Sequence, residues 1–251
     1  MLKLANVVKT FGALRAVDDV SLEVEERTLT GLIGPNGSGK TTLFNVIAGV
    51  YKPDNGEIYF KGERIDGLAP DEVFHKGIVR SFQIPRLFTG MTLLCNALIP
   101  PRHQTGEKIR YAPIHRTWKA QEIGNARKAQ KIMNTLQLDG VITNLASNIS
   151  GGQMKLLEIG RASMGEPELL LLDEPTAGVA PKLAHEIFEK IKSLAEDSGI
   201  TCFIIEHRLE LLFDFVKKIF VMHEGRIIAQ GTRDDVLKNQ TVINGYLGDY
   251  M

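Results

Sequence analysis

Several features that mark particular classes of protein are scarce or missing in this sequence. Two of its 251 residues are cysteine, Cys95 and Cys202, and they are far apart and form no CxxC motif or Cys/His cluster, so we expect two reduced thiols. The 30 basic and 30 acidic side chains cancel, so no net charge favours nucleic acid as a partner. No apolar run reaches the roughly 20 residues that a membrane-spanning helix needs. Residues 1–12 lack the apolar core of a signal peptide, and we expect none.

The hydropathy pattern indicates a globular α/β chain. Hydrophobic residues make up 43% of the sequence, and its length suffices to bury a large core without disulfides. Alternating or continuous apolar runs predict strands, apolar residues at helical spacing predict helices, and turns at 61–63 and 224–225 predict hairpins. We expect strands at 20–24, 29–33, 57–60, 169–172, 201–205, 219–222 and 226–229, and helices after Thr42, over 121–136, after Ser150 and along the apolar stripe from Ala184 to Leu194.

The middle of the chain differs from both ends. From about residue 84 to 164 no convincing alternating strand is found, and the prolines and polar residues from Pro100 to Trp118 indicate a loop or an insertion. We therefore predict one domain in which a helical subdomain, approximately residues 84–165, is inserted into an α/β core. That core is formed by approximately residues 1–82 and 166–251.

The strand expected at 29–33 runs directly into a segment that fits the pattern GxxxxGK[ST]. Glycines there allow consecutive backbone N–H groups to point inward as a nest for an anion, and the helix that follows adds its positive dipole end. The lysine of such a loop reaches the β- and γ-phosphates of a nucleotide, and the next hydroxyl binds Mg²⁺, roles that fall to Lys40 and Thr41. The candidate phosphate-binding residues are Gly34, Pro35, Asn36, Gly37, Ser38, Gly39, Lys40, Thr41 and Thr42.

Two adjacent carboxylates follow the apolar run 169–172. A buried strand that delivers charge at its C-terminal edge places it where ligands bind in open α/β sheets. Asp173 is then a candidate to hold Mg²⁺, and Glu174 to act as general base on an attacking water. Taken alone, the pair also fits a carboxylate that caps a helix, but the neighbouring phosphate loop favours the catalytic interpretation.

A second anion-binding corner is predicted at Ser150, Gly151, Gly152 and Gln153, where a serine and two glycines precede a helix. The phosphate loop, then Ser-Gly-Gly-Gln, then an apolar run ending in Asp-Glu, in this order, resembles the ATP-binding cassette family over nearly the whole chain. Ile149 stands where the family signature usually has leucine. The resemblance implies a P-loop NTPase fold: a RecA-like α/β core, an antiparallel β subdomain and an inserted α-helical subdomain, with ATP and Mg²⁺ as ligands.

Three further residues receive a role only through this resemblance. Phe11 matches the aromatic that stacks on adenine, although a lone phenylalanine is more often part of a core. Gln83 matches the glutamine between the subdomains that contacts Mg²⁺ and water. His207 matches the switch histidine that hydrogen-bonds the γ-phosphate and orients Glu174 and water, with a purely structural histidine as the alternative.

The resemblance also implies how the chain would work. Two cassettes, identical or different, would sandwich two ATP molecules, with Ser150, Gly151 and Gly152 of one capping the γ-phosphate bound to the other. Closure on ATP and opening after hydrolysis would drive integral membrane permease subunits and, indirectly, a solute-binding protein; no nucleic acid is expected. The cassette would be cytoplasmic, peripheral on the inner face of the cell membrane. Leu87 and Phe88, near the subdomain boundary, fit either a docking site for a permease helix or the core.

Within the family, several stretches resemble the ATPase subunit of branched-chain amino acid importers. They are 79–88, the segment between Asn96 and Gln121, 177–181, 205–209 and 242–248. Ala180 stands where the family often has an aspartate that couples the two nucleotide sites, and this branch often replaces it. Urea import or lipopolysaccharide export by a similar cassette, a soluble ATPase of the family, and a module that binds ATP without hydrolysing it stay open as alternatives.

Overall fold

The computed structural model of the chain describes residues 1–81 and 85–242. A central six-stranded sheet carries the α/β part, and its strands are parallel to their neighbours except at one edge, where β10 runs antiparallel to β9. In spatial order the strands are β10 (Arg226–Gly231), β9 (Lys218–His223), β3 (Leu29–Ile33), β8 (Thr201–Ile205), β7 (Leu169–Asp173) and β6 (Ile78–Arg80). The mixed α/β class predicted from the sequence is confirmed.

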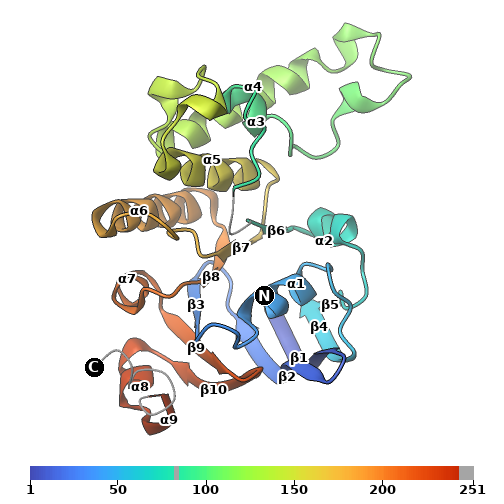
Figure 1. Cartoon of the computed structure of the whole chain (residues 1–251). Helices are drawn as coiled ribbons and strands as arrows, with labels where there is room; N and C mark the ends of the chain where they lie inside the picture. The colour runs from blue at the N-terminus through green and yellow to red at the C-terminus, as the bar shows by residue number, and fades with distance from the viewer. Residues whose placement is uncertain (82–84, 243–251) are drawn as a thin grey trace.

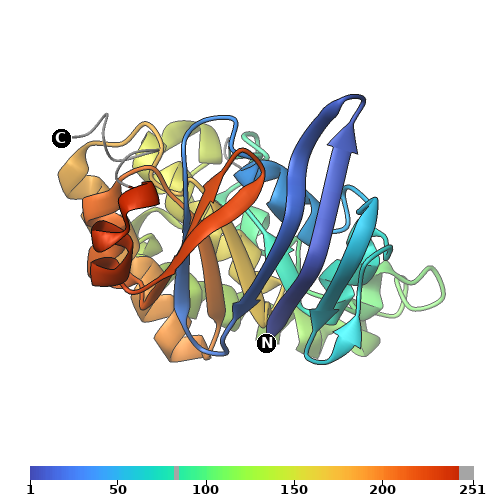
Figure 2. The ribbon, with the colours of Figure 1, turned by 90° about the horizontal axis from the view of Figure 1, so that it is seen from below.

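A second, four-stranded antiparallel sheet lies beside the central one (Figure 2). Its order is β2 (Leu14–Val24), β1 (Leu2–Phe11), β4 (Asn55–Phe60) and β5 (Glu63–Arg64). β4 and β5 pair through Tyr59 with Arg64 and Phe60 with Glu63, which confirms the hairpin expected around the turn at 61–63. The second predicted hairpin is confirmed by the pairing of β9 with β10.

The helices gather at two places. Helices α3 (Leu93–Ala97), α4 (Lys119–Thr135) and α5 (Gly151–Met164) form one end of the molecule, above α6 (Pro181–Ser198) in Figure 1. Helices α1 (Lys40–Ile47), α2 (Pro70–Lys76), α7 (Leu209–Phe215), α8 (Arg233–Lys238) and α9 (Gln240–Val242) pack around the two sheets. Short 3₁₀ turns interrupt the connections at η1 (Thr105–Glu107), η2 (His115–Thr117), η3 (Asp139–Val141) and η4 (Ala146–Asn148).

Successive residues of the central strands point into two different cores. In β7, Leu169 and Leu171 lie in a core shared with the antiparallel sheet and α1, whereas Leu170 and Leu172 lie in a core shared with α3 to α6. Side chains alternate between the two faces of a strand, so a sheet covered on both faces needs an unbroken apolar strand. This is why residues 169–172 and 201–205 show no polar alternation.

The helical end of the molecule shares a core with the central sheet. Met133 and Leu136 at the C-terminal end of α4 and Leu157 of α5 belong to the same buried cluster as Leu170 and Ile204 of the strands. Ile33 of β3 belongs to this cluster as well, so side chains from both before and after the middle segment help to stabilise it. The boundaries of the inserted helical subdomain, approximately residues 84–165, remain a prediction from the sequence.

Several elements differ from the sequence-based expectations. The helix expected over 121–136 begins earlier, at Lys119, and the strand expected at 20–24 is the second half of a longer one, β2. Helices α2, α3, α7 and α8 and the strand β6 were not predicted, because each is too short for its apolar residues to show a period. Among the described residues of the middle segment, the only β pairing is a bridge between Thr92 and Leu145.

Both cysteines are free thiols, Cys95 exposed and Cys202 buried in β8. Burial raises the pKa of the Cys202 thiol to about 12, so it stays protonated. In the described part of the chain, no helix is both long enough and apolar enough to cross a membrane.

Asn96 of α3 holds the segment that enters the helical end. Its buried side chain accepts a hydrogen bond from the backbone N–H of Phe88 (2.9 Å) and donates to the carbonyls of Phe88 (3.0 Å) and Thr92 (3.0 Å). A buried amide that satisfies both its donor and its acceptor in this way fixes the backbone it bridges.

Asn96→Ala should lower the free energy of unfolding by about 1–3 kcal/mol, because the Phe88 N–H loses its acceptor and the carbonyls of Phe88 and Thr92 each lose one of their two donors. Urea unfolding followed by circular dichroism measures the change. Asn134→Ala on the exposed face of α4 is the matched control and should leave stability unchanged or slightly raised, since alanine favours helix. Equal losses in the two variants would contradict a bridging role for Asn96.

Candidate nucleotide-binding site

The predicted phosphate loop lies between the end of β3 and the start of α1. Gly34 and Gly39 adopt φ values of 152° and 101°, and each backbone packs against a neighbouring carbonyl. A Cβ on Gly34 would lie 2.0 Å from the carbonyl oxygen of Met222, and one on Gly39 would lie 2.0 Å from that of Ala16. Only glycine fits at these two positions, because both the conformation and the close approach exclude a side chain.

Lys40 lies inside this loop. Its Nζ donates to the carbonyl oxygens of Gly34 (2.8 Å) and Pro35 (2.9 Å) and contacts the Ser38 hydroxyl at 3.4 Å. Burial lowers the pKa of the Lys40 ammonium, while the nearby carboxylates Glu174 and Asp173 oppose that shift. The side chain is thus a buried cation held by neutral acceptors, a setting in which an entering phosphate would find strong electrostatic attraction.

A cleft of about 610 Å³ opens above the loop and brings together predicted residues from four parts of the chain. Phosphate-loop residues form its floor, and Phe11, Glu174 and His207 lie on its walls. The predicted site residues that line it are Phe11, Asn36, Gly37, Gly39, Lys40, Thr41, Thr42, Glu174 and His207. Gln83 lies outside the residues that the structure describes.

Phe11 lies at the end of β1 with 43% of its surface exposed, so the alternative of a core phenylalanine is not what the structure shows. Asp54 fixes the residues before it: its carboxylate accepts from the backbone N–H and hydroxyl of Thr10, both at 2.6 Å, and from Lys9 Nζ at 2.8 Å. The hydrogen bond from Lys9, and after it those from Thr10, hold the pKa of the Asp54 carboxyl well below its usual range. An edge-on contact with Tyr51, 5.2 Å between ring centroids, leaves Phe11 on the cleft wall.

Glu174 and His207 form a pair at the ends of adjacent strands. His207 Nε2 lies 2.9 Å from Glu174 Oε1. Glu174 has a φ of 50°, a left-handed conformation that is costly for a residue with a side chain, and its N–H donates to the Ile205 carbonyl at 3.0 Å. The β7–β8 pairing and this strained turn together aim the carboxylate at the imidazole and into the cleft.

The two carboxylate oxygens of Asp173 differ in their surroundings. Its Oδ2 accepts from the Arg80 guanidinium at 2.8 Å, and the side chain is 1% exposed. Among the described residues, its buried Oδ1 has no hydrogen-bond partner. An unsatisfied buried carboxylate oxygen below the cleft suits Mg²⁺, which prefers one or two protein oxygens together with phosphate and water. The residues present, Asp173 with the exposed Thr41 hydroxyl, therefore fit this ion.

Two supporting side chains were not found from the sequence. Arg80, at the end of β6, hydrogen-bonds Asn45 of α1 as well as Asp173, so it ties the helix after the phosphate loop to the carboxylate. Glu206 is buried and accepts from the hydroxyl and N–H of Thr176 and from the N–H of His207. A lone arginine gave no sequence signal. Glu206, directly after the buried run 201–205, did offer a signal, since a charge that close to a buried strand is buried only with partners.

The Ser-Gly-Gly-Gln segment forms the start of α5, as predicted. Ser150 Oγ accepts from the Gln153 N–H at 3.3 Å, and the Gln153 side chain accepts from the Ser150 N–H at 3.0 Å. None of the four residues is among those that line the nucleotide cleft. Ala180, at the position where an aspartate was expected by resemblance, is the N-cap residue of α6 and offers no side-chain hydrogen bond.

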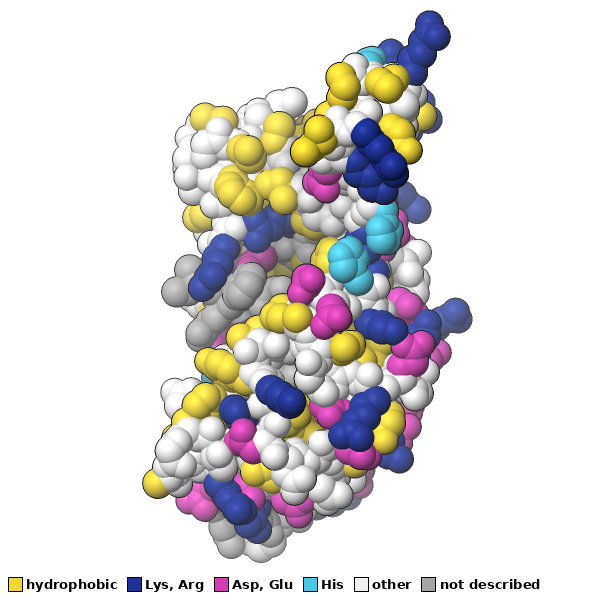
Figure 3. Space-filling model, turned by 90° about the vertical axis from the view of Figure 1, so that its right-hand side faces the viewer, with side chains coloured by type: hydrophobic (Ala, Val, Ile, Leu, Met, Phe, Trp, Pro, Cys, Tyr) yellow, Lys and Arg dark blue, Asp and Glu magenta, His cyan; other side chains and the backbone are white. Residues whose placement is uncertain are grey.

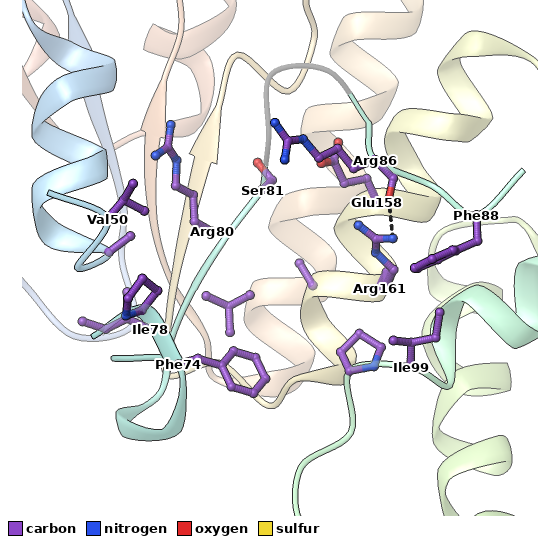
Figure 4. A pocket seen from close by; sticks show the side chains of 15 residues that line it. Val50, Phe74, Ile78, Arg80, Ser81, Arg86, Phe88, Ile99, Glu158 and Arg161 are labelled. Atoms are coloured by element: carbon purple, nitrogen blue, oxygen red, sulfur yellow. Dashed lines mark hydrogen bonds between the residues drawn. The ribbon is translucent and has the colours of Figure 1, made fainter. Parts of the chain in front are cut away.

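A second cleft of about 530 Å³ lies between α2, β6 and α5 (Figure 4). Its walls are mostly apolar and include Phe74, Phe88 and Ile99, with the guanidinium of Arg161 donating to the Arg86 carbonyl at 2.6 Å. Leu87 and Phe88, for which we expected either a docking site or the core, differ from each other. Leu87 packs against the core, whereas Phe88 is 51% exposed on the cleft wall.

Comparison with known proteins connects this geometry to a family. Residues 17–177 match the family model described as ABC transporter. A relative from Methanocaldococcus jannaschii, "Probable branched-chain amino acid transport ATP-binding protein LivG", is 43% identical over 99% of this chain and 98% of its own length.

Two solved structures resemble the whole fold. One is the ADP conformation of an ATP-binding cassette of an ABC transporter, with a TM-score of 0.85, 42% identity and coverage of 99% of this chain and 98% of the other. The second is a dimeric post-hydrolysis state of an ATP-binding cassette bound to ADP and Pi, with a TM-score of 0.76, 25% identity and coverage of 92% and 98%. The glycine-rich loop, the nucleotide cleft and these similarities agree, and the chain belongs to the ABC transporter family as one of its ATPase cassettes.

Proposed function

We propose that this chain is the ATP-hydrolysing subunit of an importer for branched-chain amino acids. The observation that carries the ATPase part is the single cleft that joins the phosphate loop, Phe11 and the Glu174–His207 pair. The solute is supported by the name of the relative from Methanocaldococcus jannaschii, which is 43% identical along nearly the whole length of both chains.

Binding begins with an exchange of partners at Lys40. In the structure its ammonium is satisfied by two loop carbonyls, so an arriving triphosphate replaces neutral acceptors by charged ones. The backbone N–H groups of residues 36–41, at the start of α1, surround the phosphates, and Phe11 supplies a π face for adenine. Thr41, Asp173 and Gln83 are proposed to hold Mg²⁺, which neutralises phosphate charge when it is bound.

Hydrolysis is proposed to use the Glu174–His207 pair. Glu174 accepts a proton from the water that attacks the γ-phosphorus, and the bond from that phosphorus to the β–γ bridging oxygen breaks, so that ADP and inorganic phosphate leave. His207 holds the Glu174 carboxylate in place and hydrogen-bonds the γ-phosphate. The 2.9 Å contact between His207 Nε2 and Glu174 Oε1 supports this assignment, because it holds the two side chains against each other. The bonds from Thr176 and His207 to buried Glu206 fix the backbone that carries this histidine.

The second half of each site is proposed to come from another cassette, the same chain or a different one. Ser150, Gly151, Gly152 and Gln153 begin α5 away from the chain's own nucleotide cleft, and the positive end of this helix suits the γ-phosphate bound across a dimer. The dimeric relative bound to ADP and Pi supports this arrangement. Because Ala180 stands in place of the usual aspartate, the coupling between the two nucleotide sites would lack that carboxylate.

The second cleft is proposed to receive a cytoplasmic segment of an integral membrane permease, which places the cassette at the inner face of the membrane. Exposed Phe88 and the apolar walls offer area for a short helix, and arginines at the rim offer charge for its ends. Arg80 of β6 lines this cleft and pairs with Asp173, so it joins the second cleft to the carboxylate at the end of β7. A solute-binding protein would act on the permease and only indirectly on this chain.

Lys40→Ala should abolish detectable ATP binding, because both the cation and the anchor of the loop are lost. Isothermal titration with Mg-ATP measures the affinity. Lys192→Ala, an exposed lysine of α6, is the control and should bind as the unaltered protein does. Tight ATP binding by the Lys40 variant would show that the loop is not the phosphate site.

Glu174→Gln should bind ATP, lose about 10²–10⁴-fold in turnover and accumulate as an ATP-dependent dimer, since the bound nucleotide is no longer consumed. Phosphate release and sedimentation with and without Mg-ATP, at several protein concentrations, measure both effects. Glu196→Gln on the surface of α6 is the control. Normal turnover would remove Glu174 from the role of base; a persistent monomer without turnover would contradict a homodimer.

Phe11→Ala and Phe88→Ala form a reciprocal pair, because the two rings are similarly exposed in different clefts. Phe11→Ala should weaken ATP binding by about 1–3 kcal/mol, taking base-stacking values as a guide, and leave permease assembly intact. Phe88→Ala should weaken permease assembly and leave ATP binding unchanged. Titration with ATP and co-purification with co-expressed permease subunits measure the two effects, and the opposite pattern would refute the assignment of the clefts.

A further inference from the structure

An arm formed by residues 103–119 projects from the helical end of the molecule, before α4 (Figure 1). Most of its residues are exposed, and Ile109 at 92% is the most exposed of the large hydrophobic side chains in the described part of the chain. Ile114 is 51% exposed in the same arm. Figure 3 shows lysine and arginine side chains at its end, with hydrophobic side chains beside them.

The charge of the arm is mainly positive, and Glu107 is its one acidic residue. Lys108, Arg110, Arg116 and Lys119 are exposed, and no aspartate or glutamate lies between the first and the last of them. This concentration contrasts with the whole chain, in which 30 basic and 30 acidic residues cancel. A local cationic surface therefore exists on a protein without net charge.

The arm is ordered by its own hydrogen bonds. The Thr117 hydroxyl donates to the Ile114 carbonyl at 2.7 Å, and the Trp118 indole N–H donates to the Ala112 carbonyl at 3.1 Å. Turn bonds from the N–H of Tyr111 to Lys108 (2.8 Å) and of Ile114 to Tyr111 (2.8 Å) continue the pattern. Ile109 is thus presented to solvent by a folded backbone, although an apolar side chain gains nothing from water.

The base of the arm is anchored next to the second cleft. Ile99 and Pro100 line that cleft and lead directly into the arm. Arg102 donates to the carbonyls of His75 and Glu166, each at 3.3 Å, and the rings of His75 and His103 stack at 5.5 Å between centroids. The arm therefore departs from the rim of the cleft that is proposed to receive the permease.

We propose that this arm is a contact surface for the anionic headgroups of the membrane beside the permease, with Ile109 and Ile114 entering the interface and the cations pairing with lipid phosphates. Its place next to the bilayer rests on the proposed function; its affinity for lipid does not. Exposed cations interspersed with single apolar side chains are typical of segments that bind membrane surfaces. A protein partner is less well matched, because the core of such an interface is a continuous apolar patch depleted of charge.

Co-sedimentation of the full chain with vesicles tests this inference. The unaltered protein should bind vesicles of phosphatidylglycerol and phosphatidylcholine in equal parts, should not bind phosphatidylcholine alone, and should dissociate at high salt. The variant K108Q/R110Q/R116Q/K119Q should lose about fivefold in partition coefficient for each cation removed. I109S/I114S should also lose affinity while keeping the salt dependence of what remains.

A matched control removes four exposed lysines elsewhere, K3Q/K131Q/K192Q/K217Q, and should bind vesicles as the unaltered protein does. Thermal unfolding verifies that all variants are folded. ATP turnover in solution should be unchanged in every one of them, because none of these residues lines the nucleotide cleft. If the ATPase proposal is wrong, ATP turnover and nucleotide binding will fail. If only the membrane contact is wrong, vesicle binding will fail while turnover and nucleotide binding stay intact.

Three results would overturn the inference. The first is that the unaltered protein binds neutral and anionic vesicles equally, or that the control variant loses as much vesicle binding as the arm variant does. The second is no vesicle binding together with loss of permease assembly in neutral detergent by the arm variants, which would make the arm a protein contact. The third is equal binding to vesicles and to an oligonucleotide without any effect of I109S/I114S, which would indicate a general polyanion patch.

Discussion

The parallel pairing of β3, β7 and β8 is the constraint on which the nucleotide site depends. Leu32 pairs with Ile205 and Asp173 pairs with Ile205, so the three strands end at the same edge of the sheet. The phosphate loop follows β3, Glu174 follows β7 and His207 follows β8. Groups separated by more than a hundred residues in sequence therefore meet at one edge, as in other open α/β sheets.

That register is enforced by burial on both faces of the sheet. A slip of one residue in β7 would exchange the leucines that fill the core next to α1 with those that fill the core next to α5. The charged residues at the strand ends are then held in a fixed place by tight packing. This rigidity makes the strained φ of Glu174 sustainable, because many contacts around the turn hold a backbone that is unfavourable by itself.

Buried charge links the site to the rest of the molecule. Asp173 is almost fully buried and is balanced by Arg80 on the edge strand, which also reaches Asn45 behind the phosphate loop. Removing either partner would leave an uncompensated charge in the core. The same arginine lines the second cleft, so a displacement of β6 would reach Asp173 through the Arg80 guanidinium.

The sequence by itself determined the local chemistry. The glycine spacing of residues 34–39, the Asp-Glu pair after an apolar run and the serine cap of α5 are properties of short segments, and each was predicted because its geometry is set by neighbours in the chain. The tertiary structure alone decided which segments meet: the support of Phe11 by Asp54, the Arg80–Asp173 pair and the 2.9 Å contact of His207 with Glu174. These contacts join residues on different strands and helices, and sequence periodicity holds no information about distance across a sheet.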